Sequence, residues 1–476
     1  MKPPASSSTS WWWSSSTPSP PPPQSTDAQV GVLLRQLYPI IILNTIATGM
    51  TWPALPAIAM HRLHDDIPAV ATFFGRINAA NAILDFFTNP ALGALSDSRG
   101  RRPLLLQSLA VATICNTLVA LWPSPRVIFL TKVLFGICNV TKAMGYSMLV
   151  DAMDAAKVSR PARVEAFGRI GMAIGAGFSL GPLIGGLIGT QSPVITVAVA
   201  AVIMACATCW AYLVLPETLA PHSGRPPKPL RYEIFASCRH TAMLWHPRLV
   251  TFALSFLLAA VAAGPYAIWY VYAQARFGWG GLKNGAFLAG YGAMAVLAQG
   301  VLLPRLTPTH LSEQSVVFVG FMSNSALFAM FGTLDQRNNG VVFALLPICL
   351  FGALSEPVLR HVFTQLVPPE DQGALQGAIA SLSTIGNACG PLLAARLLSF
   401  GARAPCTWIA AVIGGCGNLA ALPCFFSSAL FLASSFISQC AFTTHLQTFS
   451  EHSGEKRIES ENESLLQLEA VDNDAS

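Results

Sequence analysis

Long apolar segments recur along the whole chain and are separated by short polar turns. Each is about 20 residues long, the length of an α-helix that crosses a bilayer. Six are expected at residues 35–58, 69–91, 103–122, 127–149, 167–189 and 194–215, and six more at 249–272, 286–304, 315–333, 341–359, 374–398 and 407–430. The pattern predicts an all-α integral membrane protein with twelve transmembrane helices in two six-helix halves.

Composition agrees with this pattern and marks the ends of the two halves. The 476 residues are 53% hydrophobic and only 11% charged. The first 34 residues are rich in Ser, Pro and Thr, a composition that buries too little apolar surface to fold alone. We therefore expect a disordered tail at 1–34, an N-terminal bundle at 35–217, a polar connector at 218–248, a C-terminal bundle at 249–434 and an acidic tail at 435–476.

The Lys and Arg residues between the segments predict the orientation. Thirteen lie in one set of turns and six in the opposite set. Because cytoplasmic loops of membrane proteins are enriched in these residues, both termini and the connector are expected in the cytoplasm. This distribution explains the net charge of +5 without a nucleic-acid partner.

One turn is unusually charged. Asp97, Arg101 and Arg102 lie between the second and third segments, with Gly93 before them and Gly100 between Asp97 and Arg101. A glycine allows close approach of two helix backbones, and a glycine at a turn can adopt a positive φ. Charges concentrated in a turn between two apolar spans indicate a conformational role, and the family resemblance described below implies that this role is the gate at the inner mouth.

The two halves also repeat. A Gly-Pro pair at Gly181-Pro182 recurs 209 residues later as Gly390-Pro391, in the fifth and eleventh segments. Small residues at intervals of four let helices pack backbone to backbone. The candidates for such packing are Gly175, Gly181, Pro182, Gly185, Gly390 and Pro391.

The charged turn, the Gly-Pro repeat and the close of the sixth segment at Leu215–Thr218 together resemble the major facilitator superfamily. Residues 372–377 and the following Gly-Pro resemble tetracycline-resistance-type drug:proton antiporters and their eukaryotic relatives of the hippocampus-abundant-transcript type. The resemblance implies that the basic residues of the turn approach Asp151. The chain departs from the family at Ser98, where a basic residue is usual, at Asn44, where those exporters carry an acid, and at Lys132, where an arginine is usual.

Four ionisable residues inside the segments are candidates for proton coupling: Asp85, Lys132, Lys142 and Glu356. A charge in a membrane span is costly and marks a functional candidate. Alternatively, Lys132 extends its stem to the outer headgroups, and Glu356 pairs with Arg360 on one helix face. Asp85 and Lys142 are expected at the same depth, which predicts an ion pair between them.

Polar faces on three segments indicate a central cavity. Its expected lining residues are Asn44, Thr48, Thr51, Asn78, Asn81, Gln376, Ser383 and Asn387. The alternative is hydrogen bonding between helices. Tyr266, Trp269 and Tyr270 end the seventh segment, a position that favours an aromatic belt at the outer interface over contact with a flat or cationic solute.

These features predict a transporter that moves a small organic solute by alternating access, with coupling to protons by antiport. An uncoupled facilitator or importer and a non-transporting sensor or scaffold are the alternatives. No nucleophile–base arrangement or metal-ligand spacing suggests an enzyme, and no cofactor or metal is expected. We expect a monomer in lipid, in the plasma membrane or an endosomal or vacuolar membrane, with Glu461, Leu465 and Leu466 as a dileucine signal for a sorting adaptor.

Overall fold

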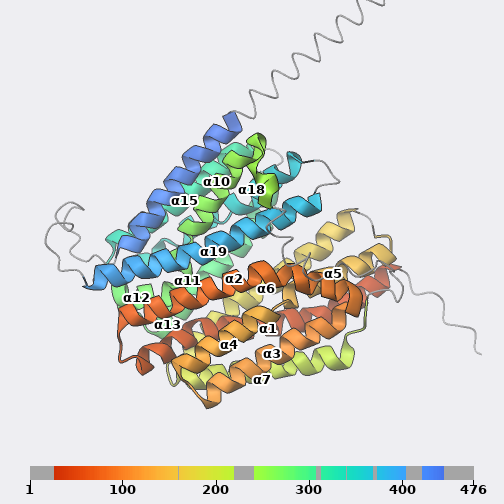
Figure 1. Ribbon diagram of the computed structural model, residues 1–476, viewed down its shortest axis with the longest axis horizontal. Coiled ribbons are helices and arrows are strands. Elements are labelled where there is room, and N and C mark those ends of the chain that lie inside the picture. The colour runs from red at the N-terminus through yellow and green to blue at the C-terminus, as the bar shows by residue number, and fades with distance from the viewer. Residues whose placement is uncertain are drawn as a thin grey trace, which may run out of the picture.

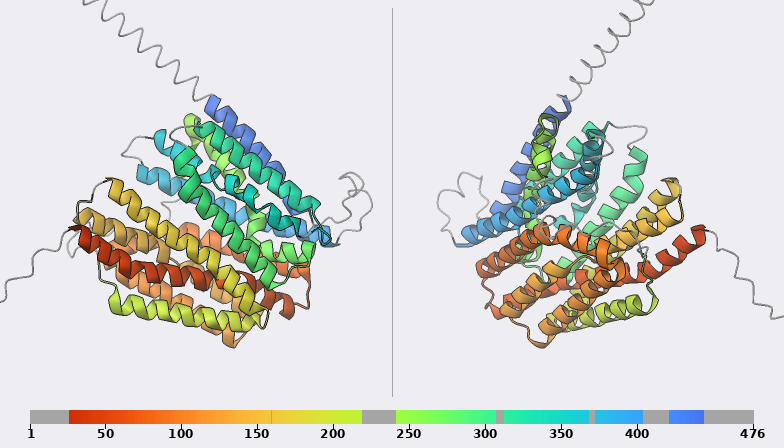
Figure 2. Two further views of the ribbon diagram at one scale, coloured as in Figure 1. Left: turned by 180° about the vertical axis from the view of Figure 1, so that it is seen from behind. Right: turned by 45° about the vertical axis from the view of Figure 1, so that its right-hand side comes forward.

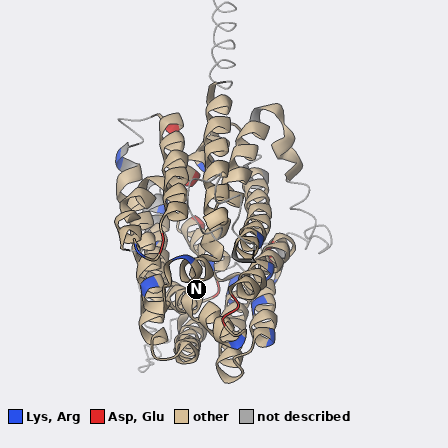
Figure 3. Cartoon of the chain, turned by 90° about the vertical axis from the view of Figure 1, so that its left-hand side faces the viewer, with Lys and Arg blue, Asp and Glu red and all other residues tan. Residues whose placement is uncertain are grey.

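A computed structural model describes residues 26–158, 160–218, 241–306, 312–338, 340–367, 372–403 and 421–443. Twelve helices within these residues are long and apolar enough to cross a membrane, which confirms the expected fold class. Charged residues are sparse along these helices (Figure 3). The N-terminal 25 residues, most of the connector and the acidic tail with its dileucine signal lie outside the described residues.

Six spans form the N-terminal half. They are α1 (Thr26–Arg62), α2 (Ile67–Arg99), α3 (Arg101–Leu121), α4 (Pro125–Cys138) continued by α5 (Thr141–Ala155), α6 (Arg160–Gly189) and α7 (Pro193–Val214). Side-chain caps begin several of them: Asp66 accepts a hydrogen bond from the Ala69 N–H at 3.0 Å at the start of α2, and Ser124 and Ser192 cap α4 and α7. A proline at the first or second helical position follows each of these three caps, where its missing N–H costs nothing.

The C-terminal half is more interrupted. Its elements are η1 (Ala242–Trp245), α10 (Pro247–Ala262), α11 (Gly264–Ala267), α12 (Trp269–Phe277), α13 (Gly281–Leu297), η2 (Ala298–Leu302), α14 (Leu303–Leu306), α15 (Glu313–Thr333), α16 (Val341–Ala344), α17 (Leu346–Gly352), α18 (Ser355–Gln365) and α19 (Gln372–Arg403). A last helix covers Leu422–Thr443. The expected end of this span at residue 430 was wrong, because apolar sequence continues to Phe442 and composition alone does not fix where the helix ends. Its expected start at residue 407 lies outside the described residues. Residues 435–443, assigned above to the tail, are therefore helical.

The fourth span is broken between α4 and α5. The freed N–H of Val140 donates to the Ser108 Oγ of α3 at 3.2 Å, and that hydroxyl lies 2.9 Å from the Thr141 Oγ1. Ser108 and Thr141 are both buried. In the absence of water, a broken helix needs such a partner from a neighbouring span.

The two halves are arranged as a V. The N-terminal half (red to yellow in Figure 1) and the C-terminal half (green to blue) meet at one end and diverge toward the end where α1 begins. The same arrangement is visible from behind in Figure 2.

Glycines hold equivalent helices together within each half. A Cβ built on Gly181 of α6 would lie 2.7 Å from the Ile46 carbonyl of α1, and one on Gly390 of α19 would lie 2.6 Å from the Val261 carbonyl of α10. The two Gly-Pro repeats therefore make repeat-related contacts, which supports their assignment to helix packing.

The halves meet through two further repeat-related pairs, α2 with α19 and α6 with α13. The Thr72 and Ser399 hydroxyl oxygens lie 3.1 Å apart, and Ser399 also donates to the Pro68 carbonyl at 3.1 Å. A Cβ on Gly186 would contact Gly285 at 3.2 Å. These contacts close the V at the end where α2 begins and α19 finishes.

Candidate functional site

A cavity of about 460 Å³ lies between the halves. Both halves line it, and its polar lining residues are Thr48, Thr51, Asn78, Asn81, Asp85, Lys132, Asn139 and Asn387. Six of the eight residues expected to face a cavity therefore do so here or in the adjoining cavity described below: Thr48, Thr51, Asn78, Asn81, Ser383 and Asn387. Asn78 also bridges the halves, because its Nδ2 donates to the Ala267 carbonyl at 3.3 Å.

Two opposite charges lie on the N-terminal wall of this cavity. Asp85 and Lys132 are both half-buried, and neither forms an ion pair with another residue in the described part of the chain. The Lys132 Nζ lies 6.0 Å from the centroid of the Phe135 ring, within the range of a cation–π contact. The side chain thus faces the cavity, not the outer headgroups as the alternative proposed.

The C-terminal wall is aromatic. Tyr266, Trp269 and Tyr270 line the cavity, and Trp269 is 1% exposed. The Trp269 ring stacks on Phe287 with centroids 4.6 Å apart, and Tyr266 lies 5.0 Å from Tyr291. The expectation of an aromatic belt at the outer interface was therefore wrong. The breaks between α10, α11 and α12 let this segment turn into the space between the halves.

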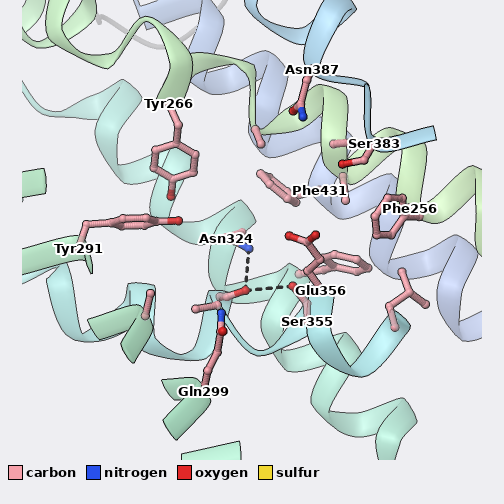
Figure 4. Close-up of a pocket in the computed structure, with 18 residues that line it drawn as sticks. Phe256, Tyr266, Tyr291, Gln299, Asn324, Ser355, Glu356, Ser383, Asn387 and Phe431 are labelled. Carbon is pink, nitrogen blue, oxygen red and sulfur yellow. Dashed lines mark hydrogen bonds between the residues drawn. The ribbon is translucent and has the colours of Figure 1, made fainter. Parts of the chain in front are cut away.

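A second cavity of about 360 Å³ adjoins the first inside the C-terminal half. The two share the lining residues Ala263, Tyr266, Tyr291 and Asn387. Glu356 projects into it, surrounded by aromatic rings (Figure 4). Its Oε1 accepts from the Arg360 Nη2 at 2.9 Å, so the expected helix-face ion pair forms on the cavity wall.

The tenth span breaks beside Glu356, between α17 and α18. The Gly352 carbonyl freed by the break accepts hydrogen bonds from the Asn324 Nδ2 at 3.2 Å and the Ser355 Oγ at 3.0 Å (Figure 4). This polar lining was not expected from the sequence, because Asn324 and Gly352 lie on different spans.

The charged turn forms a cluster around Arg101. Its Nη1 lies 2.5 Å from the Asp97 Oδ1, and its Nε donates to the Asp151 Oδ2 at 3.1 Å. The same guanidinium donates to the Ser96 hydroxyl. Arg101 therefore links the end of α2 and the start of α3 to α5, in agreement with the approach to Asp151 that the family resemblance implies.

Glu217 completes this cluster. Its two carboxylate oxygens accept from the backbone N–H groups of Arg101 and Arg102, at 3.0 and 3.1 Å. Gly100, whose φ is +102°, directly precedes these two residues at the start of α3. A carboxylate at a helix N-terminus accepts hydrogen bonds from N–H groups that have no partner within the helix, and its negative charge interacts favourably with the helix dipole. Glu217 was noted in the sequence at the end of the sixth segment, but only the fold brings its carboxylate to the N-terminus of α3.

Several expected site residues lie elsewhere. Asn44 is buried, 6% exposed, and Gln376 is exposed, and neither is among the residues that line the two cavities. A Cβ built on Gly93 would have no neighbour within 4 Å, so this glycine makes no close helix contact. Lys142 is exposed and forms no ion pair with Asp85 among the described residues. Lys142 and Asp85 keep the expected spacing to the ends of their helices, but a shared depth does not fix the helix face on which a side chain lies.

Comparison with known proteins extends these findings. The sequence profile described as Major Facilitator Superfamily matches residues 37–356. The chain is 29% identical over 360 residues to the class D tetracycline resistance protein of Salmonella ordonez, covering 76% of this chain and 88% of that protein. It is 26% identical to Hippocampus abundant transcript-like protein 1 of Bos taurus, covering 72% of this chain and 67% of that protein. The human organic anion transporter MFSD10 shares the fold, with a TM-score of 0.62, 21% identity, and coverage of 86% and 99% of the two chains.

Proposed function

The chain belongs to the Major Facilitator Superfamily, and on that premise we propose that it moves a small organic solute across a membrane by alternating access. The observation that carries the proposal is the cavity of about 460 Å³ between the two halves. Pockets for drug-sized ligands have volumes of about 300–1,000 Å³. A site at the interface of two repeat-related halves is the arrangement that alternating access requires.

The conformation corresponds to one state of an alternating-access cycle, the state that is open to the inside. The Lys and Arg distribution favours a cytoplasmic location for the end where α1 begins, and with that orientation the V opens inward. The contacts of α2 with α19 and of α6 with α13 close the outer end. Outward opening would then require these small-residue contacts to separate while the cytoplasmic ends approach one another.

The charged cluster is the proposed inner gate. Arg101 binds Asp97 and Asp151 within the N-terminal half, and Asp97 remains largely exposed. An exposed carboxylate at the mouth of the V is available for a new partner when the halves close on this side. The role of Asp97, Arg101 and Arg102 is thus conformational, not solute binding.

Proton antiport is the proposed coupling mode, with Asp85 as the titrating group. It is the carboxylate on the wall of the central cavity, reached by solute from the open side. Protonation and binding of a cationic group are mutually exclusive at one carboxylate, which is the requirement for exchange. An uncoupled facilitator is the alternative, and the neutral, buried Asn44 at the family's acidic position favours it.

Purified protein in liposomes tests both points. Uptake of a panel of labelled aromatic amines, acids and zwitterions is measured with and without an imposed pH gradient. Antiport predicts solute movement against the direction of proton flow, and its loss when the gradient is collapsed with an ionophore. Gradient-independent equilibration would establish the facilitator, and absence of transport for the whole panel would contradict the proposed function.

A further inference from the structure

The two charges of the central cavity are held at different depths. A Cβ on Gly136 of α4 would lie 2.9 Å from the Asn81 Oδ1 of α2, so these two residues share a level. Lys132 comes four residues before Gly136, and Asp85 four residues after Asn81. Because the second and fourth spans cross the membrane in the same direction, the α-carbons of Lys132 and Asp85 are about eight residues, or about 12 Å, apart along the helix axes.

Neither charge is neutralised by the protein at this site. Asp85 and Lys132 lack ion-pair partners among the described residues, and Glu356, the further carboxylate nearby, is held by Arg360. A charge inside a membrane protein is costly unless it is paired or hydrated. A solute with one charge would compensate one of these residues and leave the other.

The same cavity also presents an aromatic surface to a solute. Tyr266 and Tyr270 line the cavity from the C-terminal half, and Phe135 lies on the N-terminal wall beside Lys132. Aromatic rings favour flat apolar or aromatic ligands through stacked and edge-to-face contacts. The lining thus combines one cationic group, one anionic group and aromatic rings.

We propose that the solute is a zwitterion with an aromatic body, whose carboxylate binds Lys132 and whose amine binds Asp85. The proposal rests on the proposed function and specifies its substrate class. A molecule of this kind compensates both charges at once, and it must be long enough to reach two residues whose α-carbons lie about 12 Å apart along the helix axes.

Matched ligands test the charge requirement directly. The probe is a para-substituted biphenyl with an aminomethyl group on one ring and a carboxylate on the other. Its methyl ester is a cation, its N-acetyl derivative an anion, and the doubly blocked compound is neutral, while aminomethylbenzoic acid is a shorter zwitterion. Dissociation constants are measured by calorimetry on the full-length protein in nanodiscs at neutral pH.

We expect the biphenyl zwitterion to bind at least about tenfold more tightly than its ester, its N-acetyl derivative and the shorter acid, since one charge-assisted contact is lost in each case or both cannot form together. Lys132→Met should abolish the preference over the ester and leave the affinity for the ester unchanged. Asp85→Asn should abolish the preference over the N-acetyl derivative. Lys283→Met, which removes an exposed lysine outside the cavity, should change neither preference.

Equal affinity of the wild type for zwitterion and ester would overturn the proposal, as would a preference that survives Lys132→Met. Variant folding is checked with the neutral analogue, whose affinity should be the same in all proteins. If liposome transport is observed for other solutes while no biphenyl binds, the zwitterion assignment fails and the transport function stands. If the whole solute panel is not transported, the proposed function itself fails.

Discussion

The Nε of Arg101 donates to the Oδ2 of Asp151 at 3.1 Å, which joins the start of α3 to the end of the fourth span. The same guanidinium binds Asp97 at 2.5 Å, so one arginine connects two carboxylates from different elements. Arg101 is 13% exposed, Asp151 21% and Asp97 66%. Because solvent weakens an exposed ion pair, the contact with Asp151 contributes more to holding these helices together than the contact with Asp97.

Neutralising this cluster should slow transport without weakening solute binding. We expect Asp151→Asn to reduce the initial transport rate by at least about tenfold, since a hydrogen bond to a charged group contributes about 1.5–3 kcal/mol. Asp97→Asn should also reduce the rate, because it removes the partner proposed for the closed inner gate. The rates are measured in liposomes and the solute dissociation constants in nanodiscs.

Arg99→Gln is the matched control for this prediction. Arg99 lies in the same turn and is exposed, and no described ion pair involves it. It should transport at the wild-type rate. A loss of solute affinity in Asp97→Asn or Asp151→Asn, with a normal turnover of bound solute, would contradict the assignment to the gate.

Replacing the carboxylate in the central cavity should abolish coupling to protons while solute still crosses the membrane. We expect Asp85→Asn to lose transport driven by a pH gradient and to retain exchange of labelled for unlabelled solute, because the amide no longer binds a proton in exchange for solute. Both modes are measured on the same proteoliposomes. Unchanged gradient-driven transport in Asp85→Asn would assign coupling to another group, of which Glu356 in the second cavity is the next candidate.

A large side chain at Gly181, in the first Gly-Pro pair, should push α6 away from α1. Gly181→Leu places a side chain where even a Cβ would lie 2.7 Å from the Ile46 carbonyl, so we expect loss of folded protein or of transport. Folding is measured by thermal unfolding in detergent. Gly171→Leu is the control on the same helix, because a Cβ there meets no atom within 4 Å. A well-folded Gly181→Leu protein with wild-type transport would refute the packing role.

The broken fourth span should depend on a hydroxyl from its neighbour. Ser108→Ala leaves the buried N–H of Val140 without this acceptor, and we expect a loss of about 1–3 kcal/mol in unfolding free energy. The control is Ser98→Ala, since that exposed hydroxyl bonds only locally, to the Leu95 carbonyl at 3.0 Å. Equal thermal stability of Ser108→Ala and wild type would show that the break needs no such partner.

Spans and repeats were predictable because both depend on local sequence. A transmembrane helix satisfies its own backbone hydrogen bonds, so a run of apolar residues of bilayer length is sufficient to specify it. The two Gly-Pro pairs likewise reveal equivalent helices before any contact is known. The end of the last span was misplaced because its apolar run exceeds one bilayer length.

The broken helices and the capping of α3 were not predictable in the same way. Hydropathy does not register the break at Val140, because the compensating Ser108 belongs to another span. The carboxylate of Glu217 lies more than one hundred residues from the N–H groups of Arg101 and Arg102 that it binds. Each contact exists only after distant spans have packed together.

The sequence by itself determined which polar residues share a helix face, and tertiary structure decided what each residue meets. Asn44 and Thr48 are one turn apart, yet Asn44 is buried while Thr48 lines the cavity. Lys132 and Lys142 belong to one span, yet only Lys132 faces the cavity. Helical periodicity orients side chains relative to their own helix, whereas the environment of each face depends on the helices that pack around it and on the breaks that change its register.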